Sequence, residues 1–146
     1  MGYQFETRFR GRAKTVPLEK TPNRIRIVLA DDNKEMLDTV SELLESVPEF
    51  DIVATVADGK ALVDAALELN PDIGIVDISM PIMNGIMAAA EIKRLGSKMR
   101  IIFLTVNEDR DYERAAFEAG ASGYVVKRKM TSDLKAAIYA CVACRR

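Results

Sequence analysis

Five short runs of mainly apolar residues recur along the chain from residue 25, and a segment of helical periodicity follows each. The runs lie at 25–30, 52–56, 73–76, 101–104 and 124–126. Continuous apolar runs of this length predict strands that are buried on both faces of a sheet. Between the runs, apolar residues recur every three or four positions, which predicts amphipathic helices. These helices are expected over 34–47, 60–69, 84–95, 109–119 and about 131–144.

Polar residues and glycines punctuate the helical segments. Asn84 and Thr131 stand where helices are expected to begin, because their side chains can accept a hydrogen bond from the first turn. Gly96 and Gly120 stand where two helices are expected to end, since glycine readily adopts the conformation that stops a helix.

Strands that alternate with helices predict successive right-handed βαβ units, and therefore a parallel sheet with helices on both faces. Five strands are too few to close an eight-stranded barrel, so an open, doubly wound sheet is the better prediction. We expect a flavodoxin-like (βα)5 fold of the α/β class with the strand order 2-1-3-4-5.

The beginning of the chain differs from the rest. Residues 1–23 show no sustained periodicity and contain Pro17 and Pro22, which predicts a flexible N-terminal arm or leader. A basic docking arm is the alternative, because residues 1–24 carry six Lys and Arg against two acidic residues. Residues 24–146 are expected to form one domain.

The charge and composition of the chain after residue 24 limit the kinds of partner that it can bind. After residue 24 there are 15 basic and 20 acidic residues, which argues against direct nucleic-acid binding by this chain. No apolar stretch has the roughly eighteen residues that a membrane span needs, and the first residues lack the apolar region of a secretory signal. We therefore expect a cytoplasmic protein without membrane contact.

Histidine is missing from the sequence and cysteine is rare. The absence of histidine excludes a Ser-His triad and histidine-ligated zinc. Cys141 and Cys144 have the spacing of a CxxC motif, but they fall on the last expected helix without a second such pair. Buried packing of Cys141 is the preferred interpretation, with Cys144 beside it at the surface.

The ends of four expected strands carry polar residues that could act together. Strand 1 ends at Asp31 and Asp32, strand 3 at Asp77, strand 4 at Thr105 and strand 5 at Lys127. In an open α/β sheet, ligands bind beyond the carboxyl ends of the strands where the strand order reverses. Strands 1 and 3 flank that point, so three carboxylates are expected to share one crevice.

The crowding of three carboxylates in one crevice favours the binding of a cation there. Two carboxylates about 5 Å apart repel by roughly 3 kcal/mol at an effective dielectric constant near 20. Mg²⁺ suits a site of carboxylates, carbonyls, waters and phosphate oxygens, and would let Asp77 accept a phosphoryl group. Lys127 and Thr105 could hold the remaining phosphoryl oxygens. Singly, each of these residues is common at strand ends, and Asp31 could merely cap the following helix.

Four segments together resemble a known family. "VLADDN", "IVDISMPIMNG", "IIFLT" and "AGASGYVVK" are similar to the receiver (CheY-like) domain of bacterial two-component response regulators. The resemblance covers residues 25–144 and is strongest to the branch usually fused to a LuxR-type helix-turn-helix.

The resemblance implies a phospho-acceptor switch. Asp77 would take a phosphoryl group from a histidine kinase, and Mg²⁺ would be bound by Asp31, Asp32, Asp77 and the backbone carbonyl of Ser79. Thr105 and Tyr124 would form the switch pair. Their movement would change the face made by the fourth helix, the fifth strand and the fifth helix, with a homodimer forming on phosphorylation.

The expected output is control of transcription. The chain ends soon after the fifth expected helix, so it is either a stand-alone receiver or the excised front part of a transcription factor. The resemblance to the LuxR-linked branch favours excision, and control of transcription through a domain absent here.

The sequence departs from the family at two positions. Arg128 replaces the proline that often follows the lysine, and Val106 is larger than the usual residue after the threonine.

We expect a signalling domain without a turnover substrate.

Two alternatives fit less well. A haloacid-dehalogenase-type phosphotransferase would need a second aspartate where Ser79 stands. A scaffold that works without phosphorylation would not need the acidic residues or the lysine.

Overall fold

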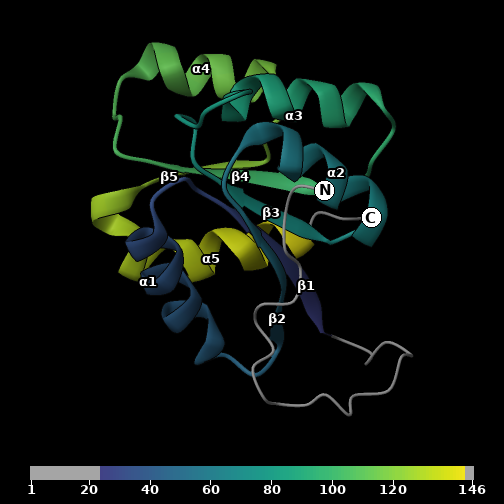
Figure 1. Cartoon of the computed structure of the whole chain (residues 1–146). Helices are drawn as coiled ribbons and strands as arrows, with labels where there is room; N and C mark the ends of the chain where they lie inside the picture. The colour runs from purple at the N-terminus through teal and green to yellow at the C-terminus, as the bar shows by residue number, and fades with distance from the viewer. Residues whose placement is uncertain (1–23, 144–146) are drawn as a thin grey trace.

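The computed structural model describes residues 24–143, which form five strands and five α-helices in strict alternation. Figure 1 shows the sheet with helices on both sides. The strands are β1 (Ile25–Ala30), β2 (Phe50–Val56), β3 (Ile73–Val76), β4 (Arg100–Thr105) and β5 (Gly123–Val126). The α-helices are α1 (Lys34–Glu45), α2 (Gly59–Leu69), α3 (Gly85–Arg94), α4 (Arg110–Glu118) and α5 (Met130–Ala143). The predicted arm at 1–23 lies outside the described residues.

All strand pairs are parallel and the strand order is β2-β1-β3-β4-β5. The predicted fold class and strand order are therefore confirmed. The central strands β3 and β4 are buried on both faces because helices cover both sides of the sheet: every residue of β3 is buried, as are five of the six residues of β4.

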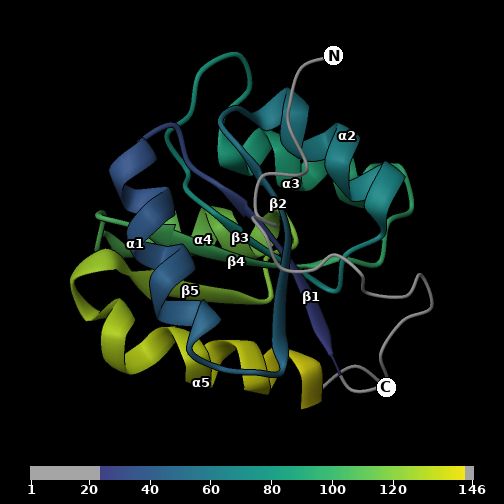
Figure 2. The same ribbon diagram turned by 60° about the horizontal axis from the view of Figure 1, so that its bottom comes forward.

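Two apolar layers hold the helices to the sheet. One core contains the inner faces of α2 and α3 and the residue Ala116 of α4, and the other contains those of α1 and α5. Figure 2 shows α1 and α5 on the opposite side of the sheet from α2 and α3. Phe103 faces the first layer and Ile102 the second, because successive side chains of a strand point to opposite faces.

Helix α4 packs most lightly of the five. Ala116 is its one buried residue, whereas Tyr112 and Phe117 are 45% and 44% exposed. The polar composition of α4 explains this light packing, because few of its residues can contribute to an apolar core.

The helix ends agree with the sequence at most positions. Asn84 caps α3, since its side chain accepts a hydrogen bond from the amide of Met87 at 2.9 Å. Gly96 and Gly120 follow the ends of α3 and α4 with φ angles of 87° and 108°, as glycine permits. Thr131 is not the start of α5. The chain enters that helix through the 3₁₀ turn η2 (Lys127–Lys129), and α5 begins at Met130.

Within residues 24–143, no helix is both long enough and apolar enough to cross a membrane.

Candidate functional site

The register of β1 and β3 brings two of the strand-end aspartates together. Ala30 pairs with Val76, and the amide of Asp77 donates a hydrogen bond to the carbonyl of Ala30 at 2.9 Å. Asp31 follows Ala30 directly. The two carboxylates therefore leave neighbouring strands at the same edge of the sheet, where the strand order reverses.

Three carboxylates converge at this edge. Asp31, Asp32 and Asp77 each offer an oxygen, and these oxygens lie within 4.8 Å of one another. Asp31 and Asp77 are only 5% and 8% exposed, whereas Asp32 is exposed. Burial next to like charges is unfavourable unless a cation is near, so the cluster is a candidate cation site.

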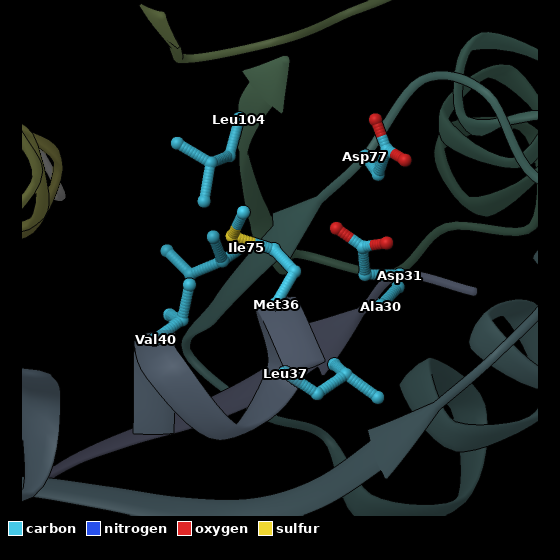
Figure 3. Close-up of a pocket in the computed structure, with 8 residues that line it drawn as sticks. All are labelled: Ala30, Asp31, Met36, Leu37, Val40, Ile75, Asp77 and Leu104. Carbon is cyan, nitrogen blue, oxygen red and sulfur yellow. The ribbon is translucent and has the colours of Figure 1, made fainter. Parts of the chain in front are cut away.

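Figure 3 shows the carboxylates of Asp31 and Asp77 facing a common space at the rim of a small pocket. The cavity volume is about 10 Å³, which is enough for about one water molecule. Its floor is apolar and is built by side chains of α1, β3 and β4: Met36, Leu37, Val40, Ile75 and Leu104.

Lys127 supplies the positive charge of the site. Its Nζ donates a hydrogen bond to Oδ2 of Asp31 at 3.0 Å and lies 3.7 Å from Oδ2 of Asp77. The Lys127 side chain is 13% exposed, so these ion pairs are poorly screened by solvent. The Lys127 ammonium thus forms ion pairs with two of the three carboxylates.

The carboxyl group of Asp77 is held in an environment that favours its protonated form. Its pKa is raised from the usual 3.8 to about 6, first because the group is buried and second because of the charge of Asp31. Lys127 and a hydrogen bond from the backbone amide of Ser79 lower the pKa, but not enough to cancel the rise. Loss of solvation is therefore the main reason that ionisation of Asp77 is unfavourable, and the charge of Asp31 adds to it.

Asp31 does not cap the following helix. The cap of α1 is Asn33, whose side chain accepts a hydrogen bond from the amide of Met36 at 3.1 Å. Asp31 instead accepts a hydrogen bond from the amide of Asn33 at 2.8 Å through Oδ1. Its other oxygen faces Lys127, so the simple capping interpretation of Asp31 is wrong.

Ser79 lies in the loop between β3 and α3, which returns close to the end of β3. The amide of Gly85 donates a hydrogen bond to the carbonyl of Ile78 at 2.7 Å. A Cβ atom at residue 85 would lie 2.4 Å from the backbone oxygen of Asp77, so only glycine permits this approach. The tight return holds the Ser79 backbone beside the carboxylate of Asp77.

Thr105 and Tyr124 contact the same residue, Asn107, in the loop between β4 and α4. Thr105 is buried, and its Oγ1 accepts a hydrogen bond from the amide of Asn107 at 3.2 Å. The hydroxyl of Tyr124 donates one to the carbonyl of Asn107 at 3.0 Å. This shared backbone partner was not predicted from the sequence.

Other residues fall outside the site. Cys141 is buried in the core layer of α1 and α5, as predicted, and Cys144 lies beyond the described residues. A surface ion pair between Glu108 and Arg128 also joins the two loops that follow Thr105 and Lys127. The sequence did not indicate this pair, although each partner stands within three residues of a predicted site residue.

Comparison with known proteins extends these observations. The family model for the response regulator receiver domain matches residues 27–139. The transcriptional regulatory protein DegU of Brevibacillus brevis is 33% identical over 111 residues, which cover 76% of this chain and 47% of DegU. This chain spans about half the length of the curated relatives that it matches first.

Solved structures agree in fold. A LuxR-family two-component response regulator from Aurantimonas sp. SI85-9A1 is 35% identical with a TM-score of 0.80, covering 84% of this chain and 88% of that one. The isolated REC domain of RcsB from Salmonella enterica serovar Typhimurium, solved with the phosphomimetic BeF₃⁻, is 28% identical with a TM-score of 0.77. It covers 85% of this chain and 92% of that one. The chain therefore belongs to the receiver domains of response regulators, the signalling domains of two-component systems.

Proposed function

We propose that this domain is a phospho-acceptor switch in which Asp77 takes a phosphoryl group from a histidine kinase. The observation that carries the proposal is the grouping of Asp31, Asp32 and Asp77 within 4.8 Å, with Lys127 in contact with two of them. A lone aspartate at a strand end would be an ordinary loop residue. A buried aspartate beside two further carboxylates and an ammonium is suited to phosphoryl chemistry.

The transfer step needs an ionised carboxylate in line with the bond that breaks. An oxygen of Asp77 attacks the phosphorus of the kinase phosphohistidine, a P–O bond forms, and the P–N bond breaks. The electron pair of the broken bond returns to the imidazole nitrogen. Lys127 lies within reach of both carboxylates and would hold one phosphoryl oxygen. Hydrolysis of the acyl phosphate would later return inorganic phosphate and the free carboxylate.

The residues present fit a bound Mg²⁺. The donors are hard oxygen atoms from Asp31, Asp32 and Asp77, and the backbone carbonyl of Ser79 would complete the set. The raised pKa of Asp77 supports this assignment, because burial disfavours its charged form and the charge of Asp31 adds repulsion, and a nearby cation would offset both. When bound, Mg²⁺ would neutralise charge on the phosphoryl oxygens and on the carboxylates.

Thr105 and Tyr124 are proposed as the residues that report phosphorylation. In the present arrangement the Thr105 hydroxyl oxygen accepts a hydrogen bond from the Asn107 amide. A phosphoryl oxygen on Asp77 would accept a hydrogen bond from that hydroxyl and draw the Thr105 side chain away from the Asn107 amide. Tyr124 would then leave the carbonyl of Asn107, and the surface of α4, β5 and α5 would change.

The proposed output is control of transcription through a domain that is not part of this chain. DegU is named as a transcriptional regulatory protein and is about twice as long as the matched region. Partners of the domain itself would be a histidine kinase and a second copy of the chain. No turnover substrate is proposed.

The proposal is tested by intact-mass measurement after incubation with acetyl phosphate and Mg²⁺. The wild-type protein should gain one phosphoryl group, and Asp77→Asn should gain none because its amide is a poor nucleophile. Omitting the metal should suppress the adduct. Asp72→Asn, a change in another aspartate beside β3, should retain it. A wild-type protein that neither forms an adduct nor binds beryllofluoride would refute the phospho-acceptor role.

A further inference from the structure

Two surface loops begin side by side at the edge of the sheet where the carboxylates of the candidate site lie. Thr105 pairs with Val126 at the ends of β4 and β5. The segment 106–109 follows Thr105, and the 3₁₀ turn η2 begins at Lys127. Whatever fixes these loops relative to each other therefore also affects the two residues proposed to hold phosphoryl oxygens.

Glu108 and Arg128 join the two loops through a two-pronged ion pair. Nε of Arg128 lies 2.7 Å from Oε2 of Glu108, and its second donor nitrogen lies 3.1 Å from Oε1. The side chains are 49% and 62% exposed. Exposed pairs usually add little to the free energy of unfolding, but the bidentate form fixes geometry well. Positioning of the loops, rather than stability of the fold, is the role that this geometry suits.

The same loop is fixed at Asn107, one residue before Glu108. Its amide donates to Thr105 and its carbonyl accepts from Tyr124. Three contacts thus hold the segment 106–109 in one arrangement, in which the Thr105 hydroxyl is engaged with the loop. Movement of Thr105 towards a phosphoryl oxygen requires that this arrangement be given up.

We propose that Glu108 and Arg128 are positioning residues whose ion pair holds the segment 106–109 in this arrangement and so opposes the rearrangement that follows phosphorylation. The inference rests on the proposed phospho-acceptor function. Its consequence is thermodynamic. A ligand that binds the rearranged state must also break the pair, so the pair lowers the apparent affinity for that ligand.

The test is the dissociation constant for beryllofluoride in excess Mg²⁺, measured by calorimetry on Glu108→Gln, Arg128→Gln and the charge-exchanged double variant. Both single variants should bind roughly two- to fivefold more tightly than wild type, in the range that loss of one exposed ion pair allows. The double variant should return towards the wild-type value. Thermal melts would verify that every variant is folded.

The two single variants separate positioning from simple electrostatics. Loss of the Glu108 charge would by itself favour an anionic ligand, whereas loss of the Arg128 charge would disfavour it. Tighter binding by both variants is therefore expected only if the pair acts as a unit. High salt should reduce the difference between wild type and the variants, because it screens an exposed pair.

A matched control exists on α3, where Arg94 and Glu91 form a similar pair with distances of 2.7 Å and 3.0 Å. Glu91→Gln and Arg94→Gln should leave the affinity unchanged. Wild-type affinity in both loop variants, or opposite changes in the two, would overturn the inference while leaving the phospho-acceptor function intact. Failure of the wild-type protein to bind beryllofluoride and to form the phosphoryl adduct would refute both.

Discussion

Asp77 is destabilising as a charged residue because it is buried next to Asp31. Its pKa in the folded protein is about 6, against an ordinary value of 3.8. The folded state therefore binds the proton more tightly than the unfolded chain, and the free energy of unfolding falls as pH rises from about 4 to about 6. Above that range the full penalty remains. The residue proposed to carry the chemistry thus weakens the fold in the absence of metal.

Asp77→Asn should accordingly stabilise the metal-free protein at neutral and alkaline pH. We expect a gain of about 1–2 kcal/mol in the free energy of unfolding near pH 8, and little gain below about pH 4. Urea unfolding in a chelating buffer would measure this difference. Asp32→Asn is the matched control, because Asp32 is exposed and should show a smaller gain. An equal gain at all pH values would contradict the electrostatic explanation.

The backbone of Ile82, in the loop between β3 and α3, is strained. Its φ angle is 69°, a region that β-branched residues rarely adopt, and the amide of Met83 donates a hydrogen bond to the carbonyl of Pro81 across it at 2.7 Å. The Ile82 side chain is 76% exposed, so little packing energy offsets the strain.

Ile82→Asn should therefore stabilise the protein by about 1 kcal/mol, because asparagine tolerates this conformation better. Chemical denaturation would detect the change. Val106→Asn is the control: Val106 is 75% exposed, but it is not among the described residues with positive φ. A similar gain in both variants would show that removal of an exposed apolar side chain, rather than relief of strain, is responsible.

The connection between β3 and α3 places the acceptor through close backbone packing. Gly85 begins α3, and its hydrogen takes the place where a side chain would meet the Asp77 backbone. Gly59 makes a similar approach to Met83 at the start of α2. These two glycines let the helices come close enough to fix the loop beside the carboxylate.

Gly85→Ala should reduce the free energy of unfolding by about 3 kcal/mol, because the added Cβ meets backbone that cannot move without shifting Asp77. It should also slow phosphorylation by acetyl phosphate. Gly123→Ala is the matched control. There the added Cβ would lie 3.3 Å from the side chain of Ile102, which can adjust, so a loss below about 1 kcal/mol is expected. Equal losses would argue against a special role for the Gly85 contact.

The elements with strong periodicity were predictable because the parallel sheet imposes its pattern locally. The central strands of such a sheet are buried on both faces and form apolar runs in the sequence. All five predicted strands agree in position with the structure to within about two residues. The beginning of α5 was not predictable in this way. Lys127–Lys129 form a 3₁₀ turn because the backbone must pass from the sheet edge into the helix, and Thr131 falls inside that helix.

The site was predictable only as far as it depends on strand ends. Asp31, Asp77 and Lys127 directly follow strands, and Thr105 is the last residue of one. The topology alone therefore brings the four residues to one edge of the sheet. The ion pair of Glu108 and Arg128 spans 20 residues between two exposed loops. With 20 acidic residues in the body of the chain, no sequence pattern selects the partner of Arg128.

Across the whole molecule, the light packing of α4 connects the site to a surface. This helix lies between the loop that holds Asn107 and strand β5, and Ala116 alone is buried among its residues. Weakly packed elements rearrange at low free-energy cost. We therefore expect a change at Thr105 and Tyr124 to shift α4 at little cost in core packing, since Ala116 is the one buried residue that this helix contributes to a core.

We expect this shift to change the oligomeric state. Addition of beryllofluoride and Mg²⁺ should increase the dimer fraction, which size-exclusion chromatography with light scattering would measure. Two faces are candidates: the surface of α4, β5 and α5, or that of α1 and α5. Tyr112→Glu on α4 should abolish the dimer in the first case, because it places a charge in an apolar contact. Thr39→Arg on α1 should abolish it in the second.

The two variants also act as controls for each other, since Tyr112 and Thr39 are both exposed and lie on different helices. Each should leave the affinity for beryllofluoride in the monomer largely unchanged, because neither touches Asp77 or its partners. A dimer whose fraction does not respond to beryllofluoride would contradict coupling between the phosphoryl site and the surface. A domain that stays monomeric throughout would assign the response to a contact with a different protein, and the α4 surface would then be the first place to test.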